Sequence, residues 1–388
     1  MIYLDNASTS WPKPEIVYKT MDEFLRTKGG NPGRGSHSMA VAAGATIDKT
    51  RMLLARYINA PEYNRVIFTL NCTDAINTAL KGLLKPGNHV VTDCIGHNAL
   101  VRPLNKLESR GIRVTRVPPS PQTGVLSVKD IEAAVVKETR LLVITHASNV
   151  NGVIQPISEY GELARRRNII FMVDAAQTAG KYPLDVRQNN IDLLAFSGHK
   201  GLYGPPGTGV LYIGETVDLD SLREGGTGSF SEQECQPDVL PDKFESGTMN
   251  SVGIAGLGAG LQFILDEGLN AIITHEQALT TRLIYGLGQI PGVTVYSAGK
   301  NSQQAPVISF NVKGYTPGDV GAILDNTFDI KVRSGLHCAP VMHKTLGTYP
   351  LGSVRISPGY MNTSQDIEST LKAVEKISRS SLKLAREK

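Results

Sequence analysis

The sequence predicts an α/β protein in which helices cover both faces of a mostly parallel β-sheet. Short apolar runs recur through its first two hundred residues, at 65–70, 89–94, 140–146, 169–175 and 192–198. These runs are continuous rather than alternating, as in strands that are buried on both faces. Helical patterns separate several of them, for example at 72–84 and 100–111. This alternation of strand and helix favours parallel pairing with helical crossovers.

A second pattern begins near residue 250 and predicts a smaller α+β domain. Residues 251–290 form one long helical pattern that breaks near Gly268. The chain then returns to strand-like runs at 305–312 and 353–359, and ends in a helical pattern at 364–388.

The length of the chain favours two domains, because 388 residues exceed one ordinary hydrophobic core. We expect a large domain over residues 15–250. The smaller domain is expected to combine residues 1–14 with 251–388. The composition, 41% hydrophobic and 20% charged, is typical of a globular protein and not of a disordered one.

Charge and hydropathy argue against several kinds of partner. The formal net charge of +4 is small and dispersed, so it gives no case for nucleic acid. No window approaches the roughly 20 apolar residues of a membrane span. Residues 1–14 lack the basic and apolar regions of a secretory signal. A cytoplasmic protein with a small-molecule substrate is therefore the expectation.

The four cysteines, Cys72, Cys94, Cys235 and Cys338, are scattered and form no CxxC pair. A disulfide framework or zinc ribbon is not expected, and a reducing compartment is the default. Cys94 and His97 could contact one metal ion, but no second pair nearby completes a ligand set. We therefore expect no metal.

Two glycine-rich stretches lack the context of a phosphate loop. Residues 201–209, GLYGPPGTG, have no Gly-Lys-Ser/Thr, and residues 256–261, GLGAGL, follow no strand. The second stretch is better explained by small residues that let a helix pack closely.

Chemically useful side chains follow the apolar runs, where a parallel sheet binds its ligands. Each has an ordinary explanation by itself: Asp174 could cap a helix, His97 could be a loop histidine, and Lys200 could be a surface lysine. Together they place a carboxylate, a lysine, imidazoles, amides and hydroxyls at one edge. The members are Asn71, Cys72, Thr73, Asp74, His97, His146, Ser148, Asn149, Asp174, Gln177, Ser197, His199 and Lys200.

A pyridoxal phosphate (PLP) site needs this combination. The cofactor aldehyde takes a lysine amine, and its ring nitrogen takes an acidic partner that keeps it protonated. Its phosphate suits a helix N-terminus with nearby hydroxyls. Asp174 and Lys200 close consecutive strand patterns, so they could lie at the ring nitrogen and at the aldehyde.

A cysteine beside a histidine stands in residues 332–340, VRSGLHCAP. Cys338 could be a small buried hydrophobe, as most lone cysteines are. It could also be a reactive thiol, which needs an exposed and electropositive niche. Arg333 and His337 are near it in sequence, but sequence alone does not decide its exposure.

Longer motifs resemble the class V aminotransferase-like, fold-type I PLP enzymes. The first two are VDAAQTAG at 173–180 and AFSGHKGLYGPPGTGVLY at 195–212. KFESGTMN at 243–250, VRSGLHCAP at 332–340 and VRISPGYMNT at 354–363 narrow the resemblance to cysteine desulfurases. The group in question includes the SUF-type enzymes and selenocysteine lyases, and the resemblance covers essentially the whole chain.

The resemblance implies a role in cofactor binding for several residues. Lys200 would attach the cofactor covalently, Asp174 would pair with the ring nitrogen, and Gln177 would bond the ring oxygen. His97 would stack on the ring. The phosphate would be held by the backbone of Cys72 and by Thr73, Ser197 and His199, with Thr248 reaching the phosphate of a neighbouring subunit in a homodimer.

The resemblance also implies how the substrate is handled. Asn149 and Arg355 would hold its carboxylate, for which the planar fork of arginine is suited. Cys338 would accept the sulfur, and its glycine-containing segment would act as a mobile delivery arm.

Three positions depart from the family pattern. Gly96 stands where a Glu usually precedes the stacking histidine, and Leu336 stands where many relatives have His. The phosphate turn, Asn71 to Thr73, also differs from the usual Gly- or Ala-led turn. Substrate choice and proton delivery therefore stay open.

The function implied is that of a PLP-dependent cysteine desulfurase, which would convert L-cysteine to alanine and leave a persulfide on Cys338. A protein sulfur acceptor and a place in iron–sulfur cluster assembly would follow. Two alternatives remain. One is another PLP-dependent lyase, acting on cystine, an S-substituted cysteine or selenocysteine. The other is a non-catalytic scaffold with the same fold.

Overall fold

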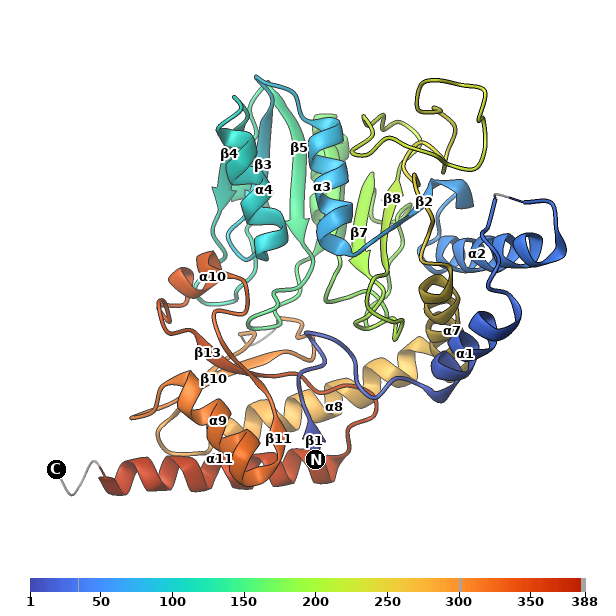
Figure 1. Cartoon of the computed structure of the whole chain (residues 1–388). Helices are drawn as coiled ribbons and strands as arrows, with labels where there is room; N and C mark the ends of the chain where they lie inside the picture. The colour runs from blue at the N-terminus through green and yellow to red at the C-terminus, as the bar shows by residue number, and fades with distance from the viewer. Residues whose placement is uncertain (34, 300–301, 385–388) are drawn as a thin grey trace.

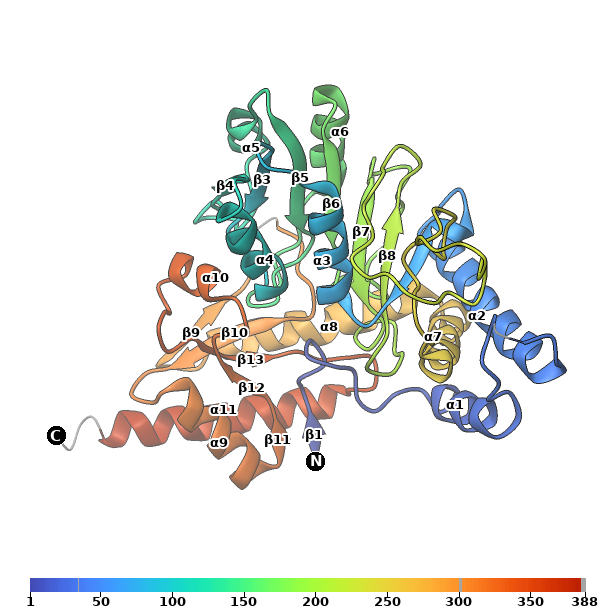
Figure 2. The same cartoon turned by 45° about the horizontal axis from the view of Figure 1, so that its top comes forward.

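The computed structural model describes residues 1–33, 35–299 and 302–384, with side chains described to residue 380. Figures 1 and 2 show a large sheet with helices on both faces and, beside its lower edge, a smaller body that contains both termini. The expected helix at the C-terminus is present as α11, Ser364–Leu384. The last four residues of that expectation, 385–388, lie outside the described residues.

The large sheet has seven strands in the order β2-β8-β7-β6-β5-β3-β4. Neighbours from β7 through β4 pair in parallel, while β8 runs antiparallel to both of its neighbours. The predicted mostly parallel sheet is therefore confirmed. The strands are β2 Val66–Thr69, β3 His89–Asp93, β4 Arg113–Val117, β5 Thr139–Thr145, β6 Ile170–Asp174, β7 Leu193–Ser197 and β8 Gly209–Ile213.

Alternate side chains of each central strand enter two separate cores, which explains the continuous apolar runs. In β5, Leu141 and Val143 join one cluster, whereas Leu142 and Ile144 join the other. The first cluster is covered by α3, Cys72–Leu83, and α4, Asn98–Glu108. The opposite face is covered by α2 Ser38–Tyr57, α5 Val128–Ala134, α6 Ile157–Arg167 and α7 Ser251–Glu267.

The smaller body is an antiparallel sheet of four strands in the order β12-β13-β10-β9. Its strands are β9 Val293–Tyr296, β10 Ile308–Val312, β12 Arg333–Gly335 and β13 Ser353–Ile356. Three helices pack on it around a third core: α8 Leu269–Gly288, α9 Pro317–Phe328 and α11. A short helix, α10 Pro340–Thr345, follows β12. The N-terminal strand β1, Ile2–Tyr3, pairs in parallel with β11, Ile330–Lys331.

The expected division at residue 250 stays a prediction, and the packing of α7 bears on it. The predicted break at Gly268 is confirmed, since α7 ends there and α8 begins at the next residue. The buried face of α7 belongs to the core of the large sheet, and α7 packs on α1, Glu15–Thr27, and on α2. We propose that the division falls within α8, because Ile272 joins the large core and Leu279 the small one.

The glycine-rich stretch in α7 serves close packing, as the sequence predicted. A Cβ atom at Gly260 would lie 2.3 Å from the carbonyl oxygen of Leu202. Within the described ranges no single helix is both long and apolar enough to cross a membrane. The bent pair α7 and α8, with 84° between its axes, meets the length and composition only when taken together.

Candidate active site

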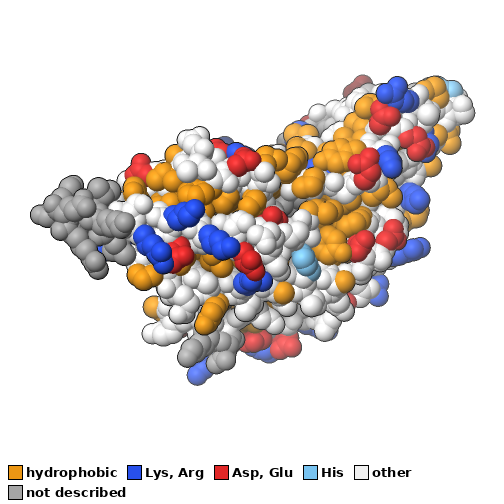
Figure 3. All heavy atoms as spheres, turned by 90° about the horizontal axis from the view of Figure 1, so that it is seen from below, with side chains coloured by type: hydrophobic (Ala, Val, Ile, Leu, Met, Phe, Trp, Pro, Cys, Tyr) orange, Lys and Arg blue, Asp and Glu red, His pale blue; other side chains and the backbone are white. Residues whose placement is uncertain are grey.

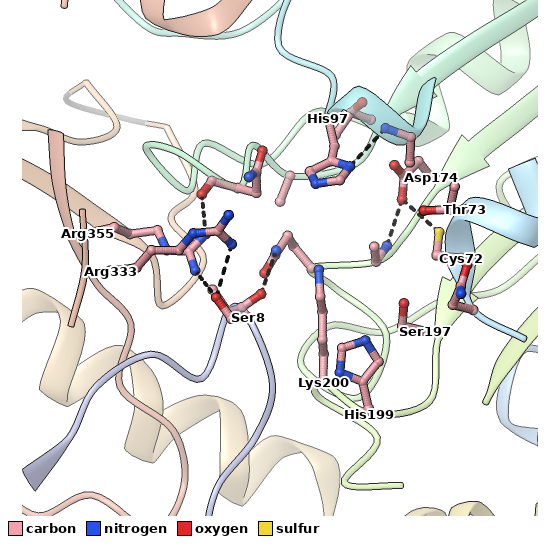
Figure 4. A pocket seen from close by; sticks show the side chains of 18 residues that line it. Ser8, Cys72, Thr73, His97, Asp174, Ser197, His199, Lys200, Arg333 and Arg355 are labelled. Carbon is pink, nitrogen blue, oxygen red and sulfur yellow. Dashed lines mark hydrogen bonds between the residues drawn. The ribbon is translucent and has the colours of Figure 1, made fainter. Parts of the chain in front are cut away.

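A cavity of about 300 Å³ opens at the carboxyl edge of the large sheet (Figure 4). The strand ends supply one wall, and the smaller domain and the N-terminal segment supply the other. Apart from Cys338 and Thr248, all the residues to which the resemblance gives a role line it, whereas Asp74, His146 and Ser148 of the strand-end group do not. The lining is Ala7, Ser8, Asn71, Cys72, Thr73, His97, Ala99, Thr145, Ala147, Asn149, Asp174, Ala176, Gln177, Ser197, His199, Lys200, Arg333 and Arg355.

Lys200 lies in a tight turn after β7 and points into the cavity (Figure 4). Burial lowers the pKa of its ammonium, while the nearby Asp174 opposes that shift. A lower pKa makes the free amine more accessible at neutral pH, as a nucleophile or base requires.

The N-terminal segment fixes the backbone just before Lys200. The carbonyl of His199 accepts hydrogen bonds from the Ser10 N–H at 3.0 Å and from the Thr9 hydroxyl at 3.1 Å. The Lys13 ammonium lies 3.4 Å from the same carbonyl, and burial lowers the pKa of Lys13 to about 8. Such a saturated carbonyl leaves the backbone of Lys200 little freedom.

Asp174 ends β6 and is 4% exposed. Its Oδ1 accepts the Ala176 N–H at 2.9 Å, and the Cys72 sulfur lies 3.5 Å from the same oxygen. Burial raises the pKa of Asp174, while the Ala176 N–H and the charge of Lys200 lower it. Its other oxygen, Oδ2, has no hydrogen bond within the described part of the chain.

One end of the cavity is shaped for an anion. Helix α3 begins at Cys72, and its N-cap Asn71 accepts from the Asp74 N–H. The first N–H groups of a helix have no intrahelical acceptor, so those of Cys72 and Thr73 are available to a ligand. Nearby, the buried Nδ1 of His199 has no partner among the described residues.

His97 is the N-cap of α4, and its ring faces the cavity (Figure 4). Its Nδ1 accepts the Ala99 N–H at 2.9 Å, which assigns the ring proton to Nε2. Burial, reinforced by the charge of Lys200, lowers the pKa of His97 to about 4. The ring is therefore neutral at physiological pH, which suits stacking on a flat ligand.

Arg355 lies in β13 with only 1% of its surface exposed. One terminal nitrogen donates to Asp5 Oδ1 and to Ser8 Oγ, both at 2.7 Å. The other donates to the backbone carbonyl of Asn149 at 3.0 Å. These contacts fix the plane of the guanidinium at the wall of the cavity, opposite the end formed by α3 (Figure 4).

Cys338 lies just beyond the lining, between β12 and α10. Arg333 connects it to the cavity, because one terminal nitrogen lies 3.2 Å from the Cys338 sulfur and the other donates to Ser8 Oγ at 3.2 Å. The Cys338 carbonyl accepts the Asn98 N–H at 2.7 Å, and the His337 carbonyl accepts from the Asn149 amide at 2.6 Å.

The segment that carries Cys338 makes several defined contacts, and its mobility as a delivery arm stays a prediction. His337 and Cys338 both adopt left-handed backbone angles, with φ of 48° and 59°. Such angles are strained for residues other than glycine, and neighbouring contacts must hold them. In this structure the segment is held at both carbonyls and at the sulfur.

Thr248 stands apart from this cavity. It lines a second hollow of about 260 Å³ beside β2, together with Leu70, Arg223 and Asn250. Its predicted contact with a neighbouring subunit's phosphate stays a prediction.

Sequence reasoning assigned no role to three polar residues of the site, Asp5, Ser8 and Arg333. Asp5 and Ser8 belong to the N-terminal YLDNAS segment, and Arg333 stands five residues before Cys338. Arg333 stands in VRSGLHCAP, one of the motifs that carry the family resemblance, and this was the available signal.

Acid is expected to loosen α10 and the residues around it, 339–348. His343 is buried within α10, with Nδ1 2.7 Å from the Thr348 hydroxyl and Nε2 without a partner in the described residues. Burial lowers the pKa of His343 to about 4. In the opened segment His343 would bind its proton at its ordinary pKa of about 6.5. The stability of the closed segment is therefore complete above pH 6.5 and is lost as the pH falls towards 4.

Amide hydrogen exchange measures this effect. The protection of residues 339–348 should fall about tenfold per pH unit below 6.5. Amides of α11, which contains no histidine, serve as the internal control. Constant protection of residues 339–348 between pH 7 and pH 5 would contradict the expected coupling.

Comparisons with known proteins agree with this geometry. The aminotransferase class-V family model matches residues 2–370. A probable cysteine desulfurase of Methanothermobacter thermautotrophicus is 37% identical over 97% of this chain and 94% of its own length. A cysteine desulfurase of Salmonella agona is 32% identical over 98% and 94%.

Solved structures give the same result and confirm the fold-type I architecture. The apo cysteine desulfurase of Thermococcus onnurineus superposes with a TM-score of 0.92 at 35% identity, covering 98% of this chain and 95% of that one. A cysteine desulfurase of Escherichia coli gives 0.87 at 29% identity, covering 98% and 94%. The chain therefore belongs to the aminotransferase class-V family, as an enzyme of the cysteine desulfurase type.

Proposed function

We propose that the cavity binds PLP and L-cysteine together, and that Cys338 takes the sulfur from the substrate. The observation that carries the proposal is the bridge through Arg333. This residue lines the cavity with Lys200 and also holds the Cys338 sulfur at 3.2 Å. An amine for the cofactor and a nucleophile for sulfur are thus held at one site.

The residues present fit the cofactor. The free N–H groups at the start of α3 and the unpartnered Nδ1 of His199 suit the phosphate. Asp174 Oδ2 suits the ring nitrogen, and the amide of Gln177 suits the ring oxygen. When bound, PLP supplies an electron sink that stabilises negative charge at the substrate α-carbon.

The chain's own groups would carry out the remaining chemistry. Arg355 and Asn149 would hold the substrate carboxylate, and His97 would cover the ring. The Lys200 amine would take the α-proton. Burial lowers its pKa, so the neutral amine that a base requires is more accessible than in an exposed lysine.

The sulfur step balances without an external oxidant. The Cys338 sulfur attacks the substrate sulfur, so an S–S bond forms while the Cβ–S bond breaks. The electron pair of the broken bond goes to Cβ, which takes a proton to give alanine. Both sulfurs are oxidised and Cβ is reduced, and Arg333 would steady the charge on the attacking sulfur.

Replacing Cys338 by serine should separate cofactor binding from sulfur transfer. In Cys338→Ser the contacts to the cofactor are untouched, so the protein should stay yellow. Release of sulfide from L-cysteine in the presence of reductant should fall at least about 100-fold, because a hydroxyl is a far weaker nucleophile than a thiolate. Sulfide and alanine are measured.

The matched control is Cys235→Ser, an exposed cysteine that does not line the cavity, and it should keep its activity. Near-native turnover to pyruvate in Cys338→Ser would instead identify a β-lyase, which needs only the cofactor and a base. Turnover of selenocysteine alone would identify a selenocysteine lyase. A protein that retains no PLP would favour a scaffold.

The active site is proposed to be shared across a homodimer. Thr248 does not line the cavity of its own chain. A residue that completes the site of a partner would lie outside its own cavity in this way. Figure 3 shows apolar side chains gathered on the surface that is seen from below. Helices α1 and α2 expose several apolar side chains. These are Ile16, Tyr18, Leu25, Met39, Val41 and Met52. A second copy would cover such a surface.

Mixed dimers test the shared site. Thr248→Val should weaken PLP retention about tenfold, the loss of one hydrogen bond to a charged group. Lys200→Ala should remove covalent attachment. If Thr248 serves the partner, mixing the two variants restores one complete site per dimer and so recovers tight retention. No recovery, or a fully active monomer in sedimentation at micromolar concentration, would contradict sharing.

The finer assignments follow from this chemistry. A persulfide on Cys338 needs an acceptor, so a protein sulfur acceptor and a place in iron–sulfur cluster assembly are proposed. A reducing compartment such as the cytoplasm suits a reactive free thiol. The SUF-type group remains the proposed subgroup.

A further inference from the structure

Cys72 contacts the carboxylate that the proposed function assigns to the cofactor ring. Its sulfur lies 3.5 Å from Asp174 Oδ1, and the two residues are 5% and 4% exposed. They come from different elements, since Cys72 opens α3 and Asp174 ends β6 (Figure 4). The proposed function uses only the backbone N–H of Cys72, so it leaves the thiol without a role.

The direction of this hydrogen bond follows from burial. Burial and the neighbouring Asp174 raise the pKa of the Cys72 thiol well above its ordinary value. The sulfur therefore carries its hydrogen at neutral pH and donates it, and the carboxylate accepts. Oδ1 then has two donors, the Cys72 S–H and the Ala176 N–H, whereas Oδ2 has none within the described residues.

We propose that Cys72 is a positioning residue for Asp174. Its S–H holds the carboxylate by Oδ1, so that Oδ2 faces the cofactor's ring nitrogen and keeps a proton there. This inference rests on the proposed function, because it needs PLP in the cavity.

The electrostatic reason is the cost of a buried anion. A carboxylate out of water is stabilised by the hydrogen bonds that it accepts. Without the S–H, Asp174 would lose one of the two donors on Oδ1 and would bind a proton more tightly. The proton shared with the ring nitrogen would then move towards Asp174. The thiol thus favours a protonated ring, which is the form that withdraws electrons.

The contact can first be measured without the cofactor, by the infrared S–H stretch of the apoprotein. The S–H band that disappears in Cys72→Ala belongs to Cys72, and it should lie at the low frequency of an S–H that donates a hydrogen bond. In Asp174→Asn this Cys72 band should move to higher frequency, since a neutral amide oxygen is a weaker acceptor. The band lost in Cys94→Ala, the control, should not respond to Asp174→Asn. A Cys72 band that is insensitive to Asp174→Asn would overturn the inference.

The effect on the cofactor is then measured with PLP labelled with ¹⁵N in its ring. In Cys72→Ala the ¹⁵N resonance should move towards the value of neutral pyridine, corresponding to at least about a threefold loss in the protonation constant of the ring nitrogen. In Cys72→Ser, whose hydroxyl also donates, the resonance should stay near that of the unchanged protein.

The possible outcomes separate a failure of the proposed role of Cys72 from a failure of the proposed function. An unchanged resonance in Cys72→Ala overturns the inference and leaves the proposed function intact. Equal shifts in the alanine and serine variants also overturn it, because bulk rather than hydrogen bonding would then be responsible. Failure of the unchanged protein to bind labelled PLP overturns the proposed function, and the inference with it.

Discussion

The buried guanidinium of Arg355 is the constraint on which the site depends. A charge that is 1% exposed must be paired, because an unpaired buried ion costs several kcal/mol. Its partners come from separate segments: Asp5 and Ser8 from the N-terminus and the carbonyl of Asn149 from the loop after β5. The hydrogen bonds of the Arg355 guanidinium therefore hold the smaller domain, the N-terminal segment and the large sheet together at the site.

The N-terminal segment extends this constraint to every reactive group. Beyond Ser8 it reaches the His199 carbonyl, and the carbonyl of Ala7 accepts the Gln177 amide at 3.1 Å. Ser8 itself also bonds Arg333, the neighbour of the Cys338 sulfur. One short stretch of backbone thus sets the positions of the Lys200 amine, the Arg355 guanidinium and the Cys338 thiol. This stretch follows strand β1, which pairs with β11 in the smaller domain.

The strand ends could be predicted from sequence because two local signals coincide there. Continuous apolar runs mark buried parallel strands, and polar residues directly after them mark the ligand edge. Asp174 and Lys200 were found in this way, and both line the cavity. The division between the domains stays a proposal, because the apolar pattern of α7 does not reveal which core that helix enters.

Long-range contacts could not be predicted in the same way. Ser8 and Arg333 are 325 positions apart, so no local pattern records their bond. The pinned turn at Cys338 depends on left-handed angles at His337 and Cys338, which ordinary propensities disfavour and which only the surrounding contacts stabilise. The proposed role of Thr248 would depend on a second chain, and therefore on information that the fold of one chain does not contain.

The central claim is that one cavity brings the Lys200 amine and the Cys338 thiol to the same substrate. Its most direct test is mass spectrometry after a single turnover with L-cysteine labelled with a heavy sulfur isotope. The account predicts one labelled sulfur on the peptide that contains Cys338, together with one equivalent of alanine. Label on Cys72 or another cysteine, or pyruvate with no bound label, would contradict it.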